Sequence, residues 1–388
     1  MYDRTTVDIL DYHSSMLLDS ERLDAFRRAI QAVVKPGDIV LDIGCGTGIL
    51  SLFACQAGAA HVYAVEQGQI IEIARHACRD NGFDDRVTFV EDWSSRIDVP
   101  RRADVLLSET IGNAAFDEGI LGLVVDASKR LLVEGARMIP YALELWAAPV
   151  QADPYPPALA AWKDPLLPFD FSVGYTLSNN NLHPIQLEVA DLLGEPVRLL
   201  KIDLAGEVPE ELEAAASFPI ARQGRLHGVG LWFRAELAPG IILSNAPPNP
   251  APSWVHWLLP VPKPRVVKPG DRIDVHLRIR ENGGQWTWQF GDVHAERQKT
   301  AQTTRAGLLT SLRPSSAGRS MTPERTQASL VDLYILQAID GRTTVEEIAR
   351  RVALQFSDSI GAGDAAYAHV LEVCSRYGSR GTGGAPAA

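Results

Sequence analysis

The 388-residue sequence is poor in cysteine and in long apolar runs. Its four cysteines, Cys45, Cys55, Cys78 and Cys374, form no CxxC pair, and none has a histidine at metal-ligand spacing. This pattern predicts reduced thiols in a cytoplasmic protein without a structural zinc site. No apolar run reaches the roughly 18 residues that a membrane span needs, and the N-terminal segment lacks the apolar core of a signal peptide. We therefore expect no membrane partner.

Positive charge is also scarce. The chain has 37 basic and 48 acidic residues, which gives a formal net charge of −11. A chain with this balance repels nucleic acid and attracts basic ligands. We expect a basic substrate and no nucleic-acid partner.

The first third of the chain alternates between two kinds of pattern. Apolar runs at 39–44, 61–66, 87–91 and 103–109 read as buried strands, and the segments between the first three have helical periodicity. A helical segment over 13–35, with Ser20 as its expected cap, precedes them. Strand–helix alternation predicts the α/β class with a doubly wound parallel sheet, which we assign to a domain over 1–140.

The pattern changes after Pro140. Short β-type runs such as GVGLWFRAEL and RIDVHLRIR predict an antiparallel β-barrel domain over 141–298. A linker rich in Ser, Thr and Gly is expected over 299–323. Residues 324–378 predict a small unit of three helices, similar to a winged helix, and 379–388 predict a disordered tail.

A glycine-rich turn, LDIGCGTGILS, follows the first predicted strand. Gly44, Gly46 and Gly48 stand at alternate positions, where glycine permits a sharp turn and a close approach to a ligand. Asp42 lies just inside the strand, and Glu66 ends the second strand, where a carboxylate can accept from both hydroxyls of a ribose. A phosphate loop is excluded because no Gly-Lys-Ser/Thr follows, and the glycine spacing fits NAD less well. The pattern resembles class I S-adenosylmethionine-dependent methyltransferases.

Two serines follow the third strand. In that family this loop holds the adenine edge of the cofactor, so the resemblance implies that Ser94 and Ser95 bind S-adenosyl-L-methionine. A simple polar turn explains each serine equally well.

The stretch SETIGNAAFDEGIL carries two glutamates, Glu109 and Glu118, at the ends of a short loop. Taken singly they have ordinary explanations, because a strand end faces water and a first helical turn favours acids. Brought together, two carboxylates repel unless a cation lies between them. Arginine stays protonated, and its planar fork matches carboxylates bidentately. Beside a methyl donor, the pair predicts a clamp for a substrate guanidinium, although another cationic amine would also fit.

Several ordered motifs together resemble the protein arginine N-methyltransferases, over about residues 10 to 298. They are the double-glutamate loop, the two cofactor motifs, HSSMLLDSER from His13, SWVHWLLP near residue 254 and KDPLLPFDFSVG from Lys163. The resemblance implies methyl transfer from S-adenosylmethionine to arginine of a peptide or protein. It also implies a homodimer formed through an arm near 160–185.

The resemblance further implies roles for single residues. Arg22 would pair with the methionine carboxylate of the cofactor and with Glu109. His256 would take up the proton lost after methylation, and Trp257 would close the substrate side. Met16, like the residue at position 111, would contact the substrate.

The sequence departs from that family at three places. The family's Tyr-Phe-x-x-Tyr segment should fall near residues 3 to 7, where this chain has Asp3, Arg4 and Val7. Ile111 replaces the usual Met of the double-glutamate loop, and Val255 replaces the Thr before the histidine. The first departure leaves open a slow enzyme, or a cofactor-binding protein without activity.

The C-terminal segment QAIDGRTTVEEIARRVALQF loosely resembles PqqD-like modules, which bind leader peptides. Eight acidic and five basic residues over 324–378 argue against contact with nucleic-acid phosphates. Leader-guided modification of a natural-product precursor peptide is therefore one interpretation. A packing domain without a ligand is the other.

Overall fold

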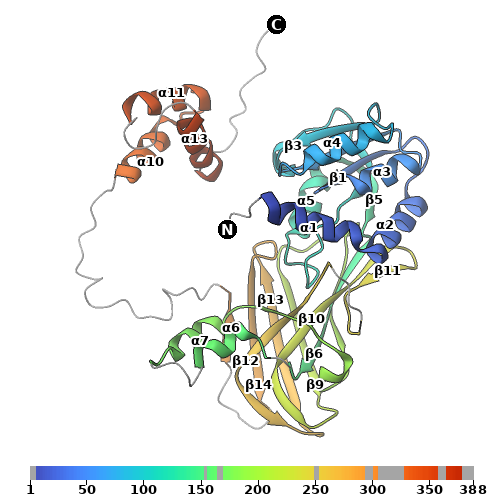
Figure 1. Cartoon of the computed structure of the whole chain (residues 1–388), viewed down its shortest axis with the longest axis vertical. Helices are drawn as coiled ribbons and strands as arrows, with labels where there is room; N and C mark the ends of the chain where they lie inside the picture. Colours follow the sequence, from blue (N-terminus) through green and yellow to red (C-terminus); the bar gives the residue numbers. More distant parts are fainter. Residues whose placement is uncertain are drawn as a thin grey trace. The chain divides into compact units, whose positions relative to one another are not determined.

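A computed structural model describes residues 6–152, 155–163, 169–248, 253–292, 300–304, 327–356 and 364–377. The chain divides into two compact units, Met1–Leu312 and Arg313–Ala388, and each is described by itself. Figure 1 labels their helices and strands. Among the described residues, no helix is both long and apolar enough to cross a membrane.

The first unit begins with a five-stranded parallel sheet in the order β3-β2-β1-β4-β5. Its strands are β1 (Ile39–Ile43), β2 (His61–Glu66), β3 (Val87–Glu91), β4 (Ala103–Leu107) and β5 (Leu132–Ile139). The helices of this part are α1 (Thr6–Leu18), α2 (Ser20–Val33), α3 (Ile49–Gln56), α4 (Ile71–Asp80) and α5 (Ile120–Arg130), with a 3₁₀ turn η1 (Ser94–Arg96). The predicted α/β class and parallel sheet are confirmed.

Burial explains why β1, β2 and β4 were visible in the sequence. Every residue of β1 is buried, as are the four central residues of β2, because helices cover both faces of a parallel sheet. Strand β5 was not recognised in the sequence because two exposed residues, Glu134 and Gly135, interrupt its apolar pattern.

Two antiparallel sheets form the rest of the first unit. One has the order β7-β12-β10-β6-β8 with β11 beside β10, and the other the order β15-β14-β13-β9. Their strands are β6 (Ala142–Val150), β7 (His183–Ile185), β8 (Val197–Asp203), β9 (Leu212–Pro219), β10 (Gly224–Ala238), β11 (Ile241–Ser244), β12 (His256–Val267), β13 (Arg272–Arg280), β14 (Gln285–Asp292) and β15 (Thr300–Thr303). Antiparallel structure is as expected, and closure into a barrel stays a prediction.

Strand β15 corrects the expected linker. Thr300 to Thr303 pair with β14, so the β-domain extends past residue 298. This strand was not recognised in the sequence because it lies in a Ser/Thr-rich run, and such runs are also typical of flexible linkers. The rest of the expected linker, from 305, lies outside the described residues, as does the expected tail at 379–388.

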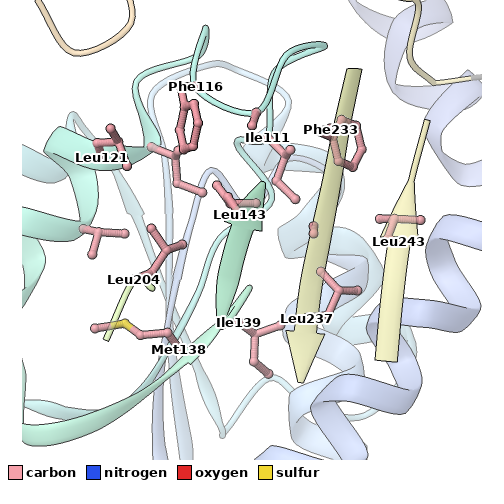
Figure 2. Packing of buried hydrophobic residues seen from close by; sticks show 14 of the residues in the cluster. Ile111, Phe116, Leu121, Met138, Ile139, Leu143, Leu204, Phe233, Leu237 and Leu243 are labelled. Atoms are coloured by element: carbon pink, nitrogen blue, oxygen red, sulfur yellow. The ribbon is translucent and has the colours of Figure 1, made fainter. Parts of the chain in front are cut away.

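One hydrophobic core joins the parallel and antiparallel parts of the first unit. Figure 2 shows Ile111 and Phe116, from the loop after β4, packed near Leu143 of β6 and Phe233 of β10. Both loop side chains are about 1% exposed. The double-glutamate loop is therefore anchored in a core that the β-domain helps to build.

Short helices follow β6 and lie along one segment: α6 (Pro157–Ala160), η2 (Ala161–Lys163) and α7 (Ser172–Ser178), with a further turn η3 (Val189–Asp191) before β8. Figure 1 shows α6 and α7 in green beside the antiparallel sheets. This is the segment in which the sequence placed the dimerisation arm.

The second unit contains three helices, α10 (Gln327–Ala338), α11 (Val345–Gln355) and α13 (Asp364–Tyr377). They enclose a small core of their own that includes Val331, Ile335, Ile348, Val352 and Val370. The three expected helices are present. No strand occurs in the described part of this unit, so the winged-helix interpretation gains no support.

Candidate active site

A cavity of about 730 Å³ opens at the carboxyl edge of the parallel sheet. It lies where β1 has β2 on one side and β4 on the other, the point at which the strand order reverses and open α/β sheets bind ligands. The lining residues are Tyr12, His13, Met16, Ile43, Gly44, Val65, Glu66, Gln67, Asp92, Trp93, Ser94, Ser95, Glu109, Thr110, Ile111, Asn113, Glu118, Gly119, Gly122, Leu123, Asp126, Ser253, Trp254 and Asn282.

The glycine turn after β1 fixes one carboxylate of this cavity. Gly44 lines the cavity in the left-handed region, with φ +77°. The backbone N–H groups of Gly46 and Gly68 donate to the two carboxylate oxygens of Glu66, at 3.2 and 2.8 Å. Glu66 is therefore held at the end of β2 with its remaining lone pairs available to a ligand.

Two other residues of the motif support the turn from behind. A Cβ on Gly48, at φ +79°, would lie 2.8 Å from the Cβ of Ala74, so this glycine lets α3 pack against α4. Asp42 is buried, and Ser51 Oγ donates to its Oδ2 at 2.6 Å while Oδ1 has no hydrogen-bond partner. Burial raises the pKa of Asp42 to about 7. Both residues position the turn and do not line the cavity.

The double-glutamate loop folds back on itself like a hairpin, through a bridge between Gly112 and Ala115. Asp117 closes it by accepting the Ala114 N–H at 2.8 Å. A Cβ on Gly112 would stand 2.2 Å from Asp117 Oδ1, so a side chain there would displace the Asp117 carboxylate. Ser108 Oγ donates to the Ile43 carbonyl at 2.9 Å and ties the loop to the end of β1.

Glu109 forms a buried ion pair with Arg22, whose Nε donates to Oε2 at 3.1 Å and whose second terminal nitrogen contacts the same oxygen. The two side chains are 5% and 6% exposed. Arg22 also donates to the Met16 carbonyl at 3.1 Å. Burial raises the pKa of the Glu109 carboxyl, and Arg22 opposes that shift. Asp19, and not Ser20, caps α2 by accepting the Arg22 N–H at 3.0 Å.

Glu118 is exposed and lines the same cavity as Glu109. It precedes Gly119, which caps α5 at φ +84°. The loop thus brings one buried and one exposed carboxylate to a single cavity. Such a pair can grip a planar cation while leaving one side open to solvent.

Two family models match consecutive parts of the chain. Residues 27–139 match ribosomal protein L11 methyltransferase (PrmA), and residues 142–292 match the arginine methyltransferase oligomerization subdomain. An arginine N(omega)-methyltransferase of Streptomyces achromogenes subsp. streptozoticus is 31% identical over 273 residues, which cover 69% of this chain and 75% of that protein. The chain belongs to the protein arginine N-methyltransferase family.

Other similar proteins agree with this assignment. Protein arginine N-methyltransferase 6 of Xenopus laevis is 31% identical over 265 residues, 64% of this chain and 77% of its own. A Trypanosoma brucei PRMT1 enzyme-prozyme complex with AdoHcy has the same fold, with a TM-score of 0.68 and 24% identity over 75% of this chain and 96% of that one. The protein is therefore an S-adenosylmethionine-dependent arginine methyltransferase.

The residues of the cavity fit this cofactor. Glu66 offers fixed acceptors for a ribose diol, and Gly44 permits close approach of the cofactor to the backbone. Ser94 and Ser95 line the wall beyond β3, where Arg130 holds the turn by donating to the Ser94 carbonyl at 2.9 Å. These groups would form the cofactor half of the cavity.

The predicted site residues fall into two sets. Those that line the cavity are Met16, Gly44, Glu66, Ser94, Ser95, Glu109, Ile111 and Glu118. Those that do not are Arg22, Asp42, Gly46, Gly48, His256 and Trp257. Arg22 and Asp42 still contact or support the first set, so the double-glutamate and cofactor motifs converge on one site.

The proton-acceptor role expected for His256 needs correction. The ring is 1% exposed, its Nδ1 accepts the Leu187 N–H at 3.0 Å, and its Nε2 lies 2.7 Å from the Asn245 carbonyl. This pairing requires the neutral tautomer with hydrogen on Nε2, and burial lowers the pKa of His256. Neither nitrogen retains a lone pair for a substrate proton. The histidine instead links the start of β12 to Leu187 and Asn245 by hydrogen bonds.

Trp257 likewise does not reach the cavity. Its Nε1 donates to Asp117 Oδ2 at 2.7 Å, so the indole braces the double-glutamate loop. Burial raises the pKa of Asp117. Of the two tryptophans in SWVHWLLP, Trp254 lines the cavity, and its Nε1 donates to the Ile111 carbonyl at 2.9 Å. SWVHWLLP contained Trp254, but periodicity could not show which indole faces the cavity.

Asn245 is a further residue that the sequence did not reveal. Its Oδ1 accepts the Phe233 N–H at 2.8 Å, and its Nδ2 donates to the Asn113 and Val255 carbonyls at 3.1 and 2.9 Å. Its own carbonyl bonds His256. One buried residue thus joins β10, the double-glutamate loop and the segment of Trp254.

Proposed function

We propose that this enzyme methylates arginine residues within peptides or proteins. The supporting observation is that Glu109 and Glu118 line one cavity beside the cofactor half. Glu66, Asp92 and Asp126 also line it, and its described lining includes no Lys or Arg. A wall of this composition favours a substrate that enters with positive charge.

A free amino acid is the alternative, because the Streptomyces relative is named for arginine and the Xenopus relative for protein arginine. Free arginine carries an α-carboxylate, which needs a cationic partner when it is desolvated. Arg22, a cation in direct contact with the clamp, is already paired with Glu109. An arginine whose carboxylate is part of an amide bond avoids this conflict.

The chemistry then follows from the geometry of the two glutamates. When bound, S-adenosylmethionine supplies a methyl group on a sulfonium. Glu109 and Glu118 hold the substrate guanidinium and draw its positive charge toward them, which leaves electron density on the nitrogen aimed at the methyl carbon. Methyl transfer would form the N–C bond as the S–C bond breaks, and the electron pair of the S–C bond would stay on sulfur. Glu118, the exposed carboxylate, accepts the proton that the nitrogen loses.

Label transfer tests the proposal. The enzyme is incubated with methyl-labelled cofactor and a set of arginine-rich peptides, their Arg→Lys counterparts, free arginine and simple amines. Mass spectrometry should find label on peptide arginines only. Label on free arginine alone, or on amines alone, would overturn the peptide assignment.

We also propose a homodimer formed through the α6–α7 segment. Phe169, Phe171 and Val173 are exposed to 74%, 45% and 57%, which is unusual for side chains so close together. The matching oligomerization subdomain supports this assignment. Light scattering should give twice the chain mass for the wild type and the monomer mass for Phe169→Glu; a wild-type monomer would contradict it.

We propose that the second unit binds a leader segment of the substrate, and that this substrate is a precursor peptide in the cytoplasm. The resemblance of the segment around α11 supports it, and Leu336, Tyr367 and Leu371 expose apolar surface on α10 and α13. In the full chain, Leu371→Glu should raise KM for a long precursor peptide and leave short peptides unaffected. Equal KM values for long and short peptides in the wild type would contradict it.

A further inference from the structure

The turn between β13 and β14 reaches the wall of the cavity. Arg280 pairs with Gln285, so residues 281–284 form the connection. Asn282 of this turn lines the cavity together with Glu118, Gly119 and Gly122. A loop of the β-domain therefore stands beside the exposed glutamate of the clamp.

The turn is rigidly held in an unusual conformation. Glu281 and Asn282 both have φ +53°, and Gly283 has φ +88°. Non-glycine residues adopt this region rarely, and such positions cluster at functional sites. The indole of Trp286 donates to the Gly283 carbonyl at 2.8 Å, and a Cβ on Gly283 would meet the Phe116 carbonyl oxygen at 1.8 Å. The backbone of the turn is thus pressed against the double-glutamate loop.

The side chain of Asn282 is oriented by α5. Its Oδ1 accepts the Gly122 N–H at 2.6 Å. A Cβ on Gly122 would lie 2.5 Å from Nδ2, and a Cβ on Gly119 3.1 Å from it. Glycine within a helix costs roughly 1 kcal/mol relative to alanine, so its presence at 122 indicates that room for this amide matters. Within the described part of the chain, the Nδ2 donor has no hydrogen-bond acceptor, and the residue is exposed.

Because Asn282 Nδ2 is a donor, it can recognise only a group that carries a hydrogen-bond acceptor. A guanidinium carries only donors, so it cannot be the partner of Nδ2. A peptide chain presents a backbone carbonyl at every residue. We propose that Asn282 Nδ2 donates to a backbone carbonyl of the substrate near the target arginine. Asn282 is then a specificity residue that distinguishes peptide-bound arginine from small guanidines, an inference that rests on the function proposed above.

The test compares two ligands in Asn282→Gly, because glycine keeps the left-handed turn and removes the amide. One ligand is a peptide in which uncharged residues flank the arginine, and this peptide has backbone carbonyls. The other is butylguanidine, which has none. We expect kcat/KM for the peptide to fall about tenfold, as for loss of one hydrogen bond, and the inhibition constant of butylguanidine to stay unchanged. Asn282→Asp still accepts the Gly122 N–H but cannot donate, so it should lower kcat/KM for the peptide as well.

Glu281→Gly is the matched control, since it has the same φ on the same turn and does not line the cavity. It should keep kcat/KM for the peptide and the inhibition constant of butylguanidine within about twofold of wild type, as expected for a surface substitution. If Asn282→Gly weakened both ligands equally, the residue would only support the structure, and if it changed neither, the inference would be wrong. Absence of any peptide methylation by the wild type would instead overturn the proposed function.

Discussion

The two halves of the cavity are built in different ways. The half that we assign to the cofactor comes from the ends of β1, β2 and β3, all within residues 39–96, and the hydrogen bonds that hold Glu66 there span only 20 and 2 residues. The other half, formed by the double-glutamate loop with Trp254 and Asn282, is the one that we assign to the substrate. Hydrogen bonds join it over 132 residues from Asn245 to Asn113, 143 from Trp254 to Ile111 and 160 from Gly122 to Asn282. Disturbing the β-domain should therefore impair substrate handling and spare cofactor binding.

The largest effect is expected where the two halves meet, at the Arg22–Glu109 ion pair. Arg22→Met leaves a buried carboxylate without its partner, which costs roughly 3–5 kcal/mol. Urea unfolding should show this loss, and Arg22→Met combined with Glu109→Leu should restore most of the stability without restoring methyl transfer. A double variant no more stable than the single one would contradict the account of the pair.

A pair of buried residues tests the separation of the halves directly. Asn245→Ala leaves several backbone groups without partners and should cost about 1–3 kcal/mol. We expect it to lower kcat with the cofactor Kd unchanged, whereas Ser51→Ala, behind the glycine turn, should raise the cofactor Kd. Equal effects of both variants on the Kd, measured by calorimetry, would show that the halves are not separable.

A smaller effect concerns Asp42 and pH. Its pKa of about 7 in the folded protein exceeds the ordinary value of 3.8, so the folded state binds the extra proton between these values. The contribution of Asp42 to stability is therefore full below pH 4 and declines as the pH rises to about 7. Asp42→Asn should be close to wild type at pH 4 and relatively more stable at pH 8, as thermal unfolding would show. A difference independent of pH would contradict the raised pKa.

This contrast also explains what the sequence could predict. Gly44 and Glu66 were recognisable because adjacent strand ends meet at one sheet edge, and short segments show strand ends. Gly48 packs against Ala74 and does not line the cavity, which the sequence could not show because helix packing and ligand approach both favour glycine. The same holds for Asn282, whose role arises from a contact across 160 residues.

His256 teaches the same lesson. A histidine beside a tryptophan in a family-like motif suggested proton transfer, but its chemistry depends on two partners, Leu187 and Asn245, that lie 69 and 11 residues away. The double-glutamate loop was predictable as a unit because its two acids and its Gly112 lie within ten residues. Its partner Arg22 followed from the family resemblance, since nothing in the local pattern pairs residues 87 positions apart.

The most direct test of the clamp is Glu118→Gln, which keeps the shape of the side chain and removes its charge. Calorimetry would measure cofactor affinity and mass spectrometry the label transferred to an arginine peptide, with Glu91→Gln, an exposed acid outside the cavity, as the control. We predict an unchanged cofactor Kd and a loss of transfer of about 100-fold or more, the size expected for a preorganised charge at a reacting group. Transfer at the wild-type rate by Glu118→Gln would contradict the central claim that two glutamates grip the substrate guanidinium.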